Sequence, residues 1–569
     1  MKLRFALLAF TIVATFFAGR KVYRPYDAIA AGDIDITMCS SPVKMVEADA
    51  SGKFMTALTG WGDLAYPVTT KVDSAQFYFN QGLSLYYSYH FTESVASFKE
   101  ASRFDPACAM AYWGQALAMG PFYNVYVYKM PEGVPAIVAT MTKLAVTVNE
   151  KEKGLIAAMA KRYSHDITNS DRMELDKNYA AALLSLKQKY PGDNNIHALY
   201  VDAVMLQHKW DFWGNDGKPR PWNEELVATC EDVLKKESHP ALMHYYIHLT
   251  EASRRPDRAV DAADQLKDKL PGIGHMVHMS SHMYQRNGLY SKGVKVNEDA
   301  HNANNNLDTK APALKLGKNK SIHYYAVQSY CAMTAGMYAK GVPIYNRARE
   351  KQVAVSPNFD KETYPQFIYM IPAIAKVRLG KWDEILEMES PAGNWKYAVA
   401  LDNFAKGMAY VRKNDPKKAK ECLLKLNEAL KDPLMKVRYM PFNSPEQSCI
   451  IAKELLGAEI AALDGDGKGA GEGYHLAIEA EDGLVYREPQ DWLLPARQYF
   501  GAYLLKTKQA KKAEEIYRED LVMNPGNGWA LLGLYQSLKD QGKAEASEYE
   551  SSYKKAFADA DVIPPTSVF

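Results

Sequence analysis

The chain has almost no excess of charge of either sign. Its 569 residues contain 69 lysines and arginines against 67 aspartates and glutamates, which gives a formal net charge of +2. A nucleic-acid-binding protein normally carries a strongly basic face. The balance therefore argues against nucleic acid as a partner, while 47% apolar residues supply ample material for a folded core.

Several motifs of well-known chemistry are missing. The six cysteines lie far apart without a CxxC pair, which excludes a zinc ribbon and a dense disulfide framework. There is no G-x-S-x-G elbow and no HExxH motif. The glycine-rich run from Asp464 to Gly473 fits neither a phosphate loop nor a calcium loop, and we interpret it as a helix-to-helix turn at Gly465. The sequence thus leaves enzyme activity open and favours a binding role.

Long hydrophobic runs are confined to the amino end. A basic start is followed by the apolar run Phe5–Gly19, which has the length of a secretory signal and is short for a membrane span of about 20 residues. Basic residues after it could also flank an uncleaved anchor. We predict that residues 1–30 are a signal peptide or an N-terminal anchor and that the protein is exported, periplasmic or secreted. A lipoprotein anchor at Cys39 is disfavoured, and no multi-span membrane domain is expected.

Internal repeats organise the rest of the chain. Residues 75–108 contain two amphipathic helical segments joined by a turn, with residue types at fixed positions of a 34-residue unit. A small residue lets the two helices approach, an aromatic residue fills the gap, and a proline ends the second helix. This pattern resembles the tetratricopeptide repeat (TPR) family. Counted from Ala75, the matches are Gly82 at position 8, Phe98 at 24, Ala101 at 27 and Pro106 at 32.

The same register returns further along the chain. Residues 400–433 and 494–527 place glycine at position 8 again. Turns of the form Gly-x-aromatic mark three further units between residues 108 and 400. The resemblance implies an all-α, right-handed superhelical solenoid of TPR-like antiparallel helix pairs. About nine pairs are recognisable, beginning near residues 75, 240, 274, 322, 366, 400, 451, 494 and 528.

The repeats also suggest how the chain is divided. An irregular N-terminal segment over 31–74 precedes an N-terminal TPR-like helical region over 75–239. Central histidine-rich pairs follow over 240–355, and C-terminal pairs with a cap over 356–561. We expect polar breaks in the helices at residues 214–221 and 302–320.

Histidine is concentrated in the central pairs. Eight of the 13 histidines fall between His239 and His323. In the units that begin at residues 240 and 274, histidines occupy the same two positions, 5 and 9, so they are one repeat apart (278 − 244 = 34 and 282 − 248 = 34). Spacings of three and four place them on one helix face. In TPR proteins this face lines the concave groove, so the resemblance implies that the following side chains converge there: His244, His248, Glu251, His275, His278, His282 and His323.

Two classes of ligand fit this cluster. His244, His248, His275, His278 and His282 have spacings suited to a transition metal such as zinc, copper, nickel or iron. Tyr245 and Tyr324 flank them and could support a metal or stack on an organic ligand. The alternatives are that the groove holds a peptide, a protein or a small ligand, or that the histidines are structural.

The sequence therefore predicts an exported TPR-repeat binding or scaffold protein with a protein or peptide partner. The alternative is a metal-binding protein or metalloenzyme that uses the histidine cluster. The chain resembles bacterial exported TPR proteins that carry a His-Tyr-Tyr helix followed by a histidine-rich helix, and this likeness implies no activity.

Overall fold

The structure is a computed structural model of the chain, and it describes residues 34–35, 43, 46–124, 128–164, 166, 171–310, 322–356, 358–440 and 442–569. Over these residues the protein is built from 24 α-helices, α2 to α25. Two strands of two residues each, β1 (Ile34–Asp35) and β2 (Tyr439–Met440), form a parallel pair. The predicted all-α fold class is confirmed.

All nine predicted helix pairs are present, and each begins within six residues of its predicted start. A turn joins the two helices of each pair, which pack against one another in antiparallel fashion. The pairs are α2 (Asp73–Tyr87) with α3 (Phe91–Phe104), α10 (Pro240–Thr250) with α11 (Val260–Lys269), α12 (Gly274–Arg286) with α13 (Tyr290–Lys310), α14 (Ile322–Thr334) with α15 (Val342–Val355), α16 (Thr363–Arg378) with α17 (Trp382–Glu387), α18 (Lys396–Arg412) with α19 (Pro416–Ala429), α20 (Pro445–Leu463) with α21 (Gly467–Asp482), α22 (Ala496–Lys506) with α23 (Ala510–Met523), and α24 (Gly528–Asp540) with α25 (Ala546–Ala556).

The less regular stretch between the first two pairs continues the same stack. The helix α4 packs on α2 and α3, and α8 packs on α9 and α10. The helices of this stretch are α4 (Ala109–Ala118), α5 (Val134–Leu144), α6 (Glu150–Lys161), α7 (Arg172–Lys189), α8 (Asn194–Gln207) and α9 (Pro221–Leu234). Short 3-10 helices lie at η1 (Ala145–Thr147), η2 (Pro256–Ala259) and η5 (Pro433–Lys436).

Glycine and aromatic residues lock neighbouring repeats together in the way that the spacing predicts. The ring of Phe98 lies between two glycines: a Cβ atom would be 2.9 Å from it at Gly82 and 2.3 Å at Gly114. The identical arrangement recurs near the other end of the chain, where Tyr517 lies between Gly501 and Gly533. Since a Cβ atom essentially never comes this close to another heavy atom, the packing of these helices requires glycine.

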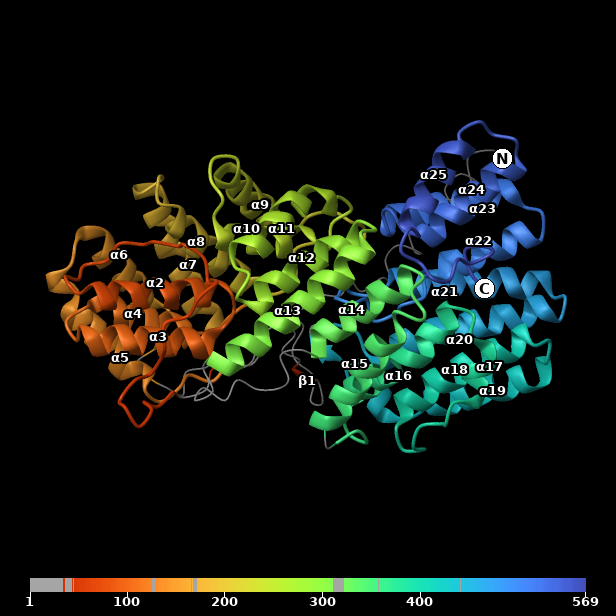
Figure 1. Cartoon of the computed structure of the whole chain (residues 1–569), viewed down its shortest axis with the longest axis horizontal. Coiled ribbons are helices and arrows are strands. Elements are labelled where there is room, and N and C mark those ends of the chain that lie inside the picture. The colour runs from red at the N-terminus through yellow and green to blue at the C-terminus, as the bar shows by residue number, and fades with distance from the viewer. Residues whose placement is uncertain are drawn as a thin grey trace, which may run out of the picture.

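The stack curves until its last pairs meet its middle (Figure 1). In this view the chain runs from α2 at the left, through α10–α14 in the middle, to α17–α20 at the right, and α22–α25 then lie at the upper right. The glycines of three Gly-x-aromatic turns make the contact: Gly288 faces the backbone of Gly526, Gly336 faces Val562, and Gly380 faces Phe569. All three have positive φ, at 71°, 75° and 68°. Residues far apart in sequence thus bring the two ends of the solenoid's second half together.

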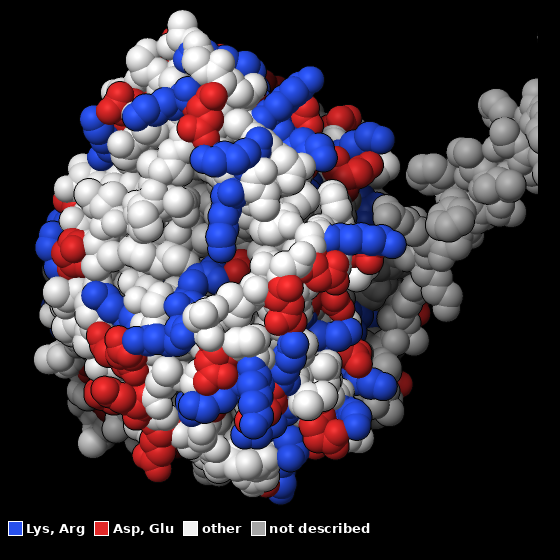
Figure 2. All heavy atoms as spheres, turned by 90° about the vertical axis from the view of Figure 1, so that its right-hand side faces the viewer, with Lys and Arg blue, Asp and Glu red and all other residues white. Residues whose placement is uncertain are grey.

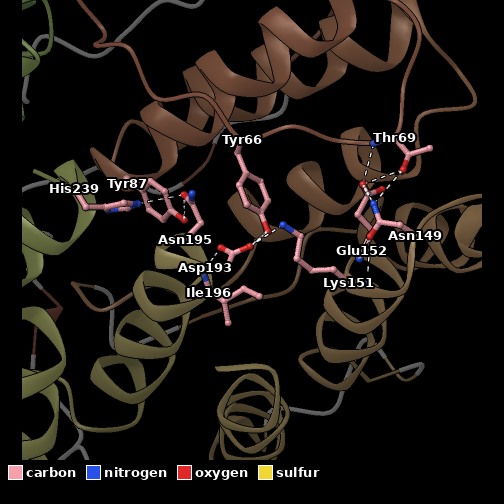
Figure 3. A network of polar contacts seen from close by, with 10 residues as sticks. All are labelled: Tyr66, Thr69, Tyr87, Asn149, Lys151, Glu152, Asp193, Asn195, Ile196 and His239. Carbon is pink, nitrogen blue, oxygen red and sulfur yellow. Dashed lines mark hydrogen bonds and ion pairs between the residues drawn. The ribbon is translucent and has the colours of Figure 1, made fainter. Parts of the chain in front are cut away.

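Residues 46–72 of the N-terminal segment contain no helix and are held on the surface of the first repeats. Figure 3 shows its side chains reaching α6 and α8. The Tyr66 hydroxyl donates to Asp193 at 3.1 Å, and Thr69 donates to Glu152 at 2.9 Å. At the left of the same view, Tyr87 donates to Asn195 at 3.3 Å. This contact fixes the C-terminal end of α2, which matters for the site below.

Several sequence predictions have an outcome in the fold. The expected break at 302–320 is wrong for residues 302–310, because α13 continues to Lys310 with Ala303 and Leu307 buried on its inner face. Gly465 does form the turn between α20 and α21, with φ at 80°. Residues 1–30 and Cys39 lie outside the described residues, so the signal or anchor stays a prediction. No helix among the described residues is long and apolar enough to cross a membrane.

Charges of both signs are mixed on the face at the C-terminal end of the solenoid. Figure 2 shows the face at the C-terminal end of the solenoid, where lysine and arginine are interspersed with aspartate and glutamate. This face therefore carries no extended basic surface of the kind that binds a nucleic-acid backbone.

Candidate metal centre

The predicted cluster is assembled from the first helices of three successive pairs. Helix α10 contributes two histidines and, directly after its last turn, Glu251; α12 contributes three histidines and α14 one. All seven side chains are buried, with at most 5% of any residue exposed. Their ligand atoms lie within 4.8 Å of one another in three groups: a first triad of His244, His248 and His275, a second triad of His278, His282 and His323, and a bridging group of His248, Glu251 and His282.

In the first triad the Nε2 atoms face one another. The Nε2 of His244 lies 3.2 Å from that of His248 and 3.0 Å from that of His275. The Nδ1 of His244 donates to the backbone carbonyl of Tyr87 at 2.7 Å. Because a carbonyl can only accept, the proton of a neutral His244 sits on Nδ1, and its Nε2 presents a lone pair to the centre of the triad.

The second triad repeats this geometry one repeat later. The Nε2 atoms of His278 and His282 are 3.1 Å apart, and the Nδ1 of His278 is 2.6 Å from the Oδ1 of Asn297. The amide nitrogen of Asn297 donates to the carbonyl of Gly293, so its oxygen is the atom that faces His278. His278 therefore also carries its proton on Nδ1, and its Nε2 is a free lone pair.

One carboxylate ties the two triads together. Glu251 accepts from the Nδ1 of His248 at 3.1 Å through one oxygen and from the Nδ1 of His282 at 2.7 Å through the other. This arrangement places the protons of both histidines on Nδ1 and turns both Nε2 lone pairs inward. In each triad, two Nε2 lone pairs then face each other at hydrogen-bond distance with no proton between them: those of His244 and His248, and those of His278 and His282.

Burial keeps the imidazoles neutral. It lowers the pKa of His244 to about 3 and holds the pKa of His248 and His278 well below the ordinary value, with neighbouring histidines adding to the effect in the last two. Burial also raises the pKa of Glu251, which the nearby Arg286 partly opposes. A proton on Glu251 would let only one of the two facing pairs gain a hydrogen bond, because the carboxyl then donates to one histidine alone. At least one pair is therefore left with two facing lone pairs and no proton between them.

The remaining predicted residues surround the triads. The ring of Tyr324 stacks on His278, with 4.0 Å between centroids, and Tyr245 packs on His244 at 5.5 Å. Neither ring nitrogen of His323 has a hydrogen-bond partner among the described residues, and the Nδ1 of His275 has none either. A buried imidazole without partners is costly unless something absent from the protein chain binds it.

The inner face at the cluster is filled by the chain itself rather than lying open. Tyr89, just after α2, stacks on His275 at 5.5 Å, and Tyr123 and Trp210 pack on His248 at 5.1 and 6.0 Å. A partly open cavity of about 120 Å³, whose wall includes His248 and Glu251, reaches the cluster. A small solute fits there, whereas a folded partner or a helix does not.

Comparisons with known proteins add little to this picture. No protein-family model matches the chain, and no curated protein matches it. The chain is similar to the crystal structure of yeast Tom70, with 11% identity, a TM-score of 0.29, and coverage of 86% of this chain and 91% of that one. It is similar to the human IFIT1 dimer with m7Gppp-AAAA at 11% identity, TM-score 0.29, and coverage of 86% and 92%. It is also similar to the structure of Naa15/Naa10 bound to HypK-THB, with 13% identity, a TM-score of 0.21, and coverage of 85% of this chain and 70% of that one.

These structures are helical-repeat proteins, but likenesses this weak transfer neither a ligand nor a partner. The nine helix pairs and the glycine-aromatic contacts establish the fold from this chain's own residues. It is a solenoid of TPR-type helix pairs.

Sequence reasoning missed three groups of the site. The carbonyl of Tyr87 is a backbone atom, so no residue type signals it. Asn297 was visible in principle, since it occupies position 24 of its TPR unit, where Phe98 and Tyr517 supply the packing ring in theirs. Glu488 is fully buried beside Glu251, and burial together with the charge of that neighbour raises its pKa to about 8. It comes from the loop after α21, which no repeat pattern places near α10.

Proposed function

We propose that this protein binds transition-metal ions in two buried three-histidine sites, one in each triad. The observation that carries the proposal is the pair of Nε2–Nε2 contacts, His244 to His248 and His278 to His282, between nitrogens whose protons are held on the opposite side of each ring. A metal ion between the nitrogens replaces the repulsion of two lone pairs with two coordinate bonds.

The dimensions of the triads suit a small divalent ion. Two imidazole nitrogens bound to one tetrahedral zinc ion at about 2.0–2.1 Å are roughly 3.3 Å apart. The facing nitrogens lie 3.0–3.2 Å apart, so a small outward movement of the rings makes room for the ion. Neutral imidazoles suit zinc, copper, nickel and iron alike, and three of them leave a fourth coordination position for water or another ligand.

The outward hydrogen bonds support the same function. In metal sites, a histidine ligand commonly donates its other N–H to a carboxylate, an amide or a backbone carbonyl, which fixes the ring and its tautomer. Here Tyr87, Asn297 and both oxygens of Glu251 supply these acceptors for His244, His278 and the pair His248 and His282.

Metal analysis of protein purified without a histidine tag tests the proposal. We expect two equivalents in the wild type, one in His244→Ala, one in His278→Ala, and none in the double variant, with unchanged far-UV circular dichroism. His475→Ala on α21, outside the cluster, is the matched control and should keep both equivalents. No stoichiometric metal, together with no thermal stabilisation by zinc, copper, nickel or iron, would sink the proposal and leave a purely structural cluster.

The scaffold role stays a proposal beside this one, supported by the TPR-type solenoid. The clustered histidines are too buried to contact a peptide or protein partner, because the most exposed of them, His323, has only 5% of its surface accessible. A partner would have to bind elsewhere on the solenoid. Export to the periplasm or outside the cell is likewise proposed, on the basic and then apolar start of the sequence.

A further inference from the structure

A second feature lies at the mouth of the metal centre, in the cavity of about 120 Å³ between the end of α10 and the C-terminal half of the solenoid. At about 30 Å³ per water molecule, the space corresponds to roughly four waters. Its apolar wall includes Trp210, Phe212 and Trp213, and its opposite wall comes from the segment after α21 and the end of α23. A small organic molecule or an inorganic ion fits this volume.

Two arginines in the wall have no carboxylate partner among the described residues. The guanidinium of Arg254 donates to the carbonyl of Asn215 at 2.9 Å, and its stem lies against Gly217, where a Cβ atom would be 2.6 Å from it. Arg286 donates to three backbone carbonyls, those of Glu251, Ser253 and Met523, at 2.8–3.0 Å. Carbonyls accept from these donors, and no carboxylate among the described residues forms an ion pair with either guanidinium.

The other charges of the cavity do not neutralise them. Arg497 is paired with Asp482 by two bonds of 2.8 Å, and Asp491 is paired with Arg487 at 2.6 Å. Burial raises the pKa of Glu481 to about 8, so this carboxyl is largely protonated at neutral pH. Asp520 accepts from two amide side chains, and burial raises its pKa too.

The arginines also crowd one another. Burial lowers the pKa of Arg254, the nearby charges of Arg286 and Arg497 lower it further, and the charges of Asp482 and Asp216 oppose this lowering in part. Like charges gathered in a partly closed space are costly unless an anion joins them, and a guanidinium offers paired N–H donors that match a carboxylate or a phosphate. Electrostatics and donor geometry therefore favour the same class of ligand.

We propose that this cavity binds a small oxyanion, a carboxylate or a phosphate, between Arg254 and Arg286 and next to the wall formed by His248 and Glu251. The site is independent of the metal: it rests on the arginines, the cavity and the absence of carboxylate partners for them. An anion bound there lies beside the histidine cluster, because His248 and Glu251 line the same cavity.

Calorimetric titration of the intact, tag-free chain at constant ionic strength tests this, with inorganic phosphate and acetate as separate probes and chloride as the control. We expect saturable binding of at least one oxyanion. Binding of phosphate alone or of acetate alone supports the site and identifies its ligand chemistry. Saturable binding of chloride with equal affinity, or no saturable binding of either oxyanion, would overturn the proposal.

The variants make the test specific. Arg254→Gln should weaken binding about tenfold or more, since it removes a charge-assisted donor pair, and Arg254→Lys should retain part of the affinity. Arg255→Gln is the matched control, because this neighbour is exposed and paired with Asp257 at 2.8 Å. Equal affinity of the Arg254→Gln and Arg255→Gln proteins would refute the site. Metal content is measured on the same samples, so that loss of anion binding can be distinguished from loss of metal.

Discussion

The replacement of Glu251 by glutamine tests the most specific feature of the centre. The carboxylate accepts from one histidine of each triad, at 3.1 Å from His248 and 2.7 Å from His282. Glutamine has the same shape but only one accepting oxygen, and its other terminal atom is an N–H donor. One of the two histidines then faces a donor and must move its own proton to Nε2, where the metal should bind. The substitution should therefore damage one site and spare the other.

The size of the effect follows from the role of such acceptors. Loss of a hydrogen bond to a metal-bound histidine typically costs 10–100-fold in metal affinity, which corresponds to about 1.4–2.7 kcal/mol. Competitive titration of the metal-free protein with a chromogenic chelator should resolve two tight equivalents in the wild type. In Glu251→Gln we expect one tight equivalent and one that is 10–100-fold weaker.

A matched glutamate provides the control. Glu231 on α9 accepts from the hydroxyl of Tyr246 on α10, one helix face away from the cluster. Glu231→Gln should leave both equivalents tight. If Glu251→Gln binds two equivalents with wild-type affinity, the bridging role is refuted. If both glutamine variants lose metal alike, the loss reflects general destabilisation and the reasoning from the two oxygens fails as well.

Three further predictions follow from the same structure. Asn297→Leu removes the acceptor of the second triad and should weaken only that equivalent by about 10–100-fold, in the same chelator titration. Without metal, the midpoint of thermal unfolding should fall as the pH drops from about 6.5, because His244 has a pKa of about 3 when folded and the unfolded chain binds the proton first. Each such histidine contributes up to about 1.4 kcal/mol per pH unit. The pKa of Glu488 is raised from 4.5 to about 8, so this group stabilises the folded chain as the pH falls between those values. A midpoint of thermal unfolding that rises on acidification would contradict the dominance of the histidines. Gly114→Ala should destabilise by about 1–3 kcal/mol in a denaturant titration, because its Cβ atom would be 2.3 Å from a phenylalanine ring, whereas Gly471→Ala, in a helix with nothing within 4 Å, should be neutral or stabilising.

The repeat register made the fold predictable. Helix packing requires glycine opposite an aromatic ring at a fixed spacing. This spacing can be recognised in the sequence, as the pairs Gly82 with Phe98 and Gly501 with Tyr517 show. The convergence of the histidines was predictable for the same reason, since residues 34 positions apart on helices α10 and α12 lie side by side.

Burial of the cluster could not be read from that register. It depends on the curvature that accumulates over many repeats, until the turn at Gly288 meets Gly526 and the loop with Glu488 reaches Glu251. Each repeat contributes a small rotation that residue types do not specify. The tautomer of His244 was equally hidden, because its partner is the backbone carbonyl of Tyr87, whose position is fixed by the contact of that side chain with Asn195.

Closure of the solenoid and the chemistry of the cluster depend on each other. Arg286, at the end of the helix that carries His278 and His282, binds the carbonyls of Glu251 and of Met523, and so joins the central repeats to the C-terminal ones directly over the triads. This contact lies in the wall of the cavity beside His248, and the burial of the imidazoles is what keeps them neutral. A closed interior with unpaired nitrogen lone pairs is unfavourable by itself. In the proposed metal-bound protein, each triad supplies three imidazole ligands to one cation, and metal binding to the folded chain would recover the free energy lost by burying the histidines.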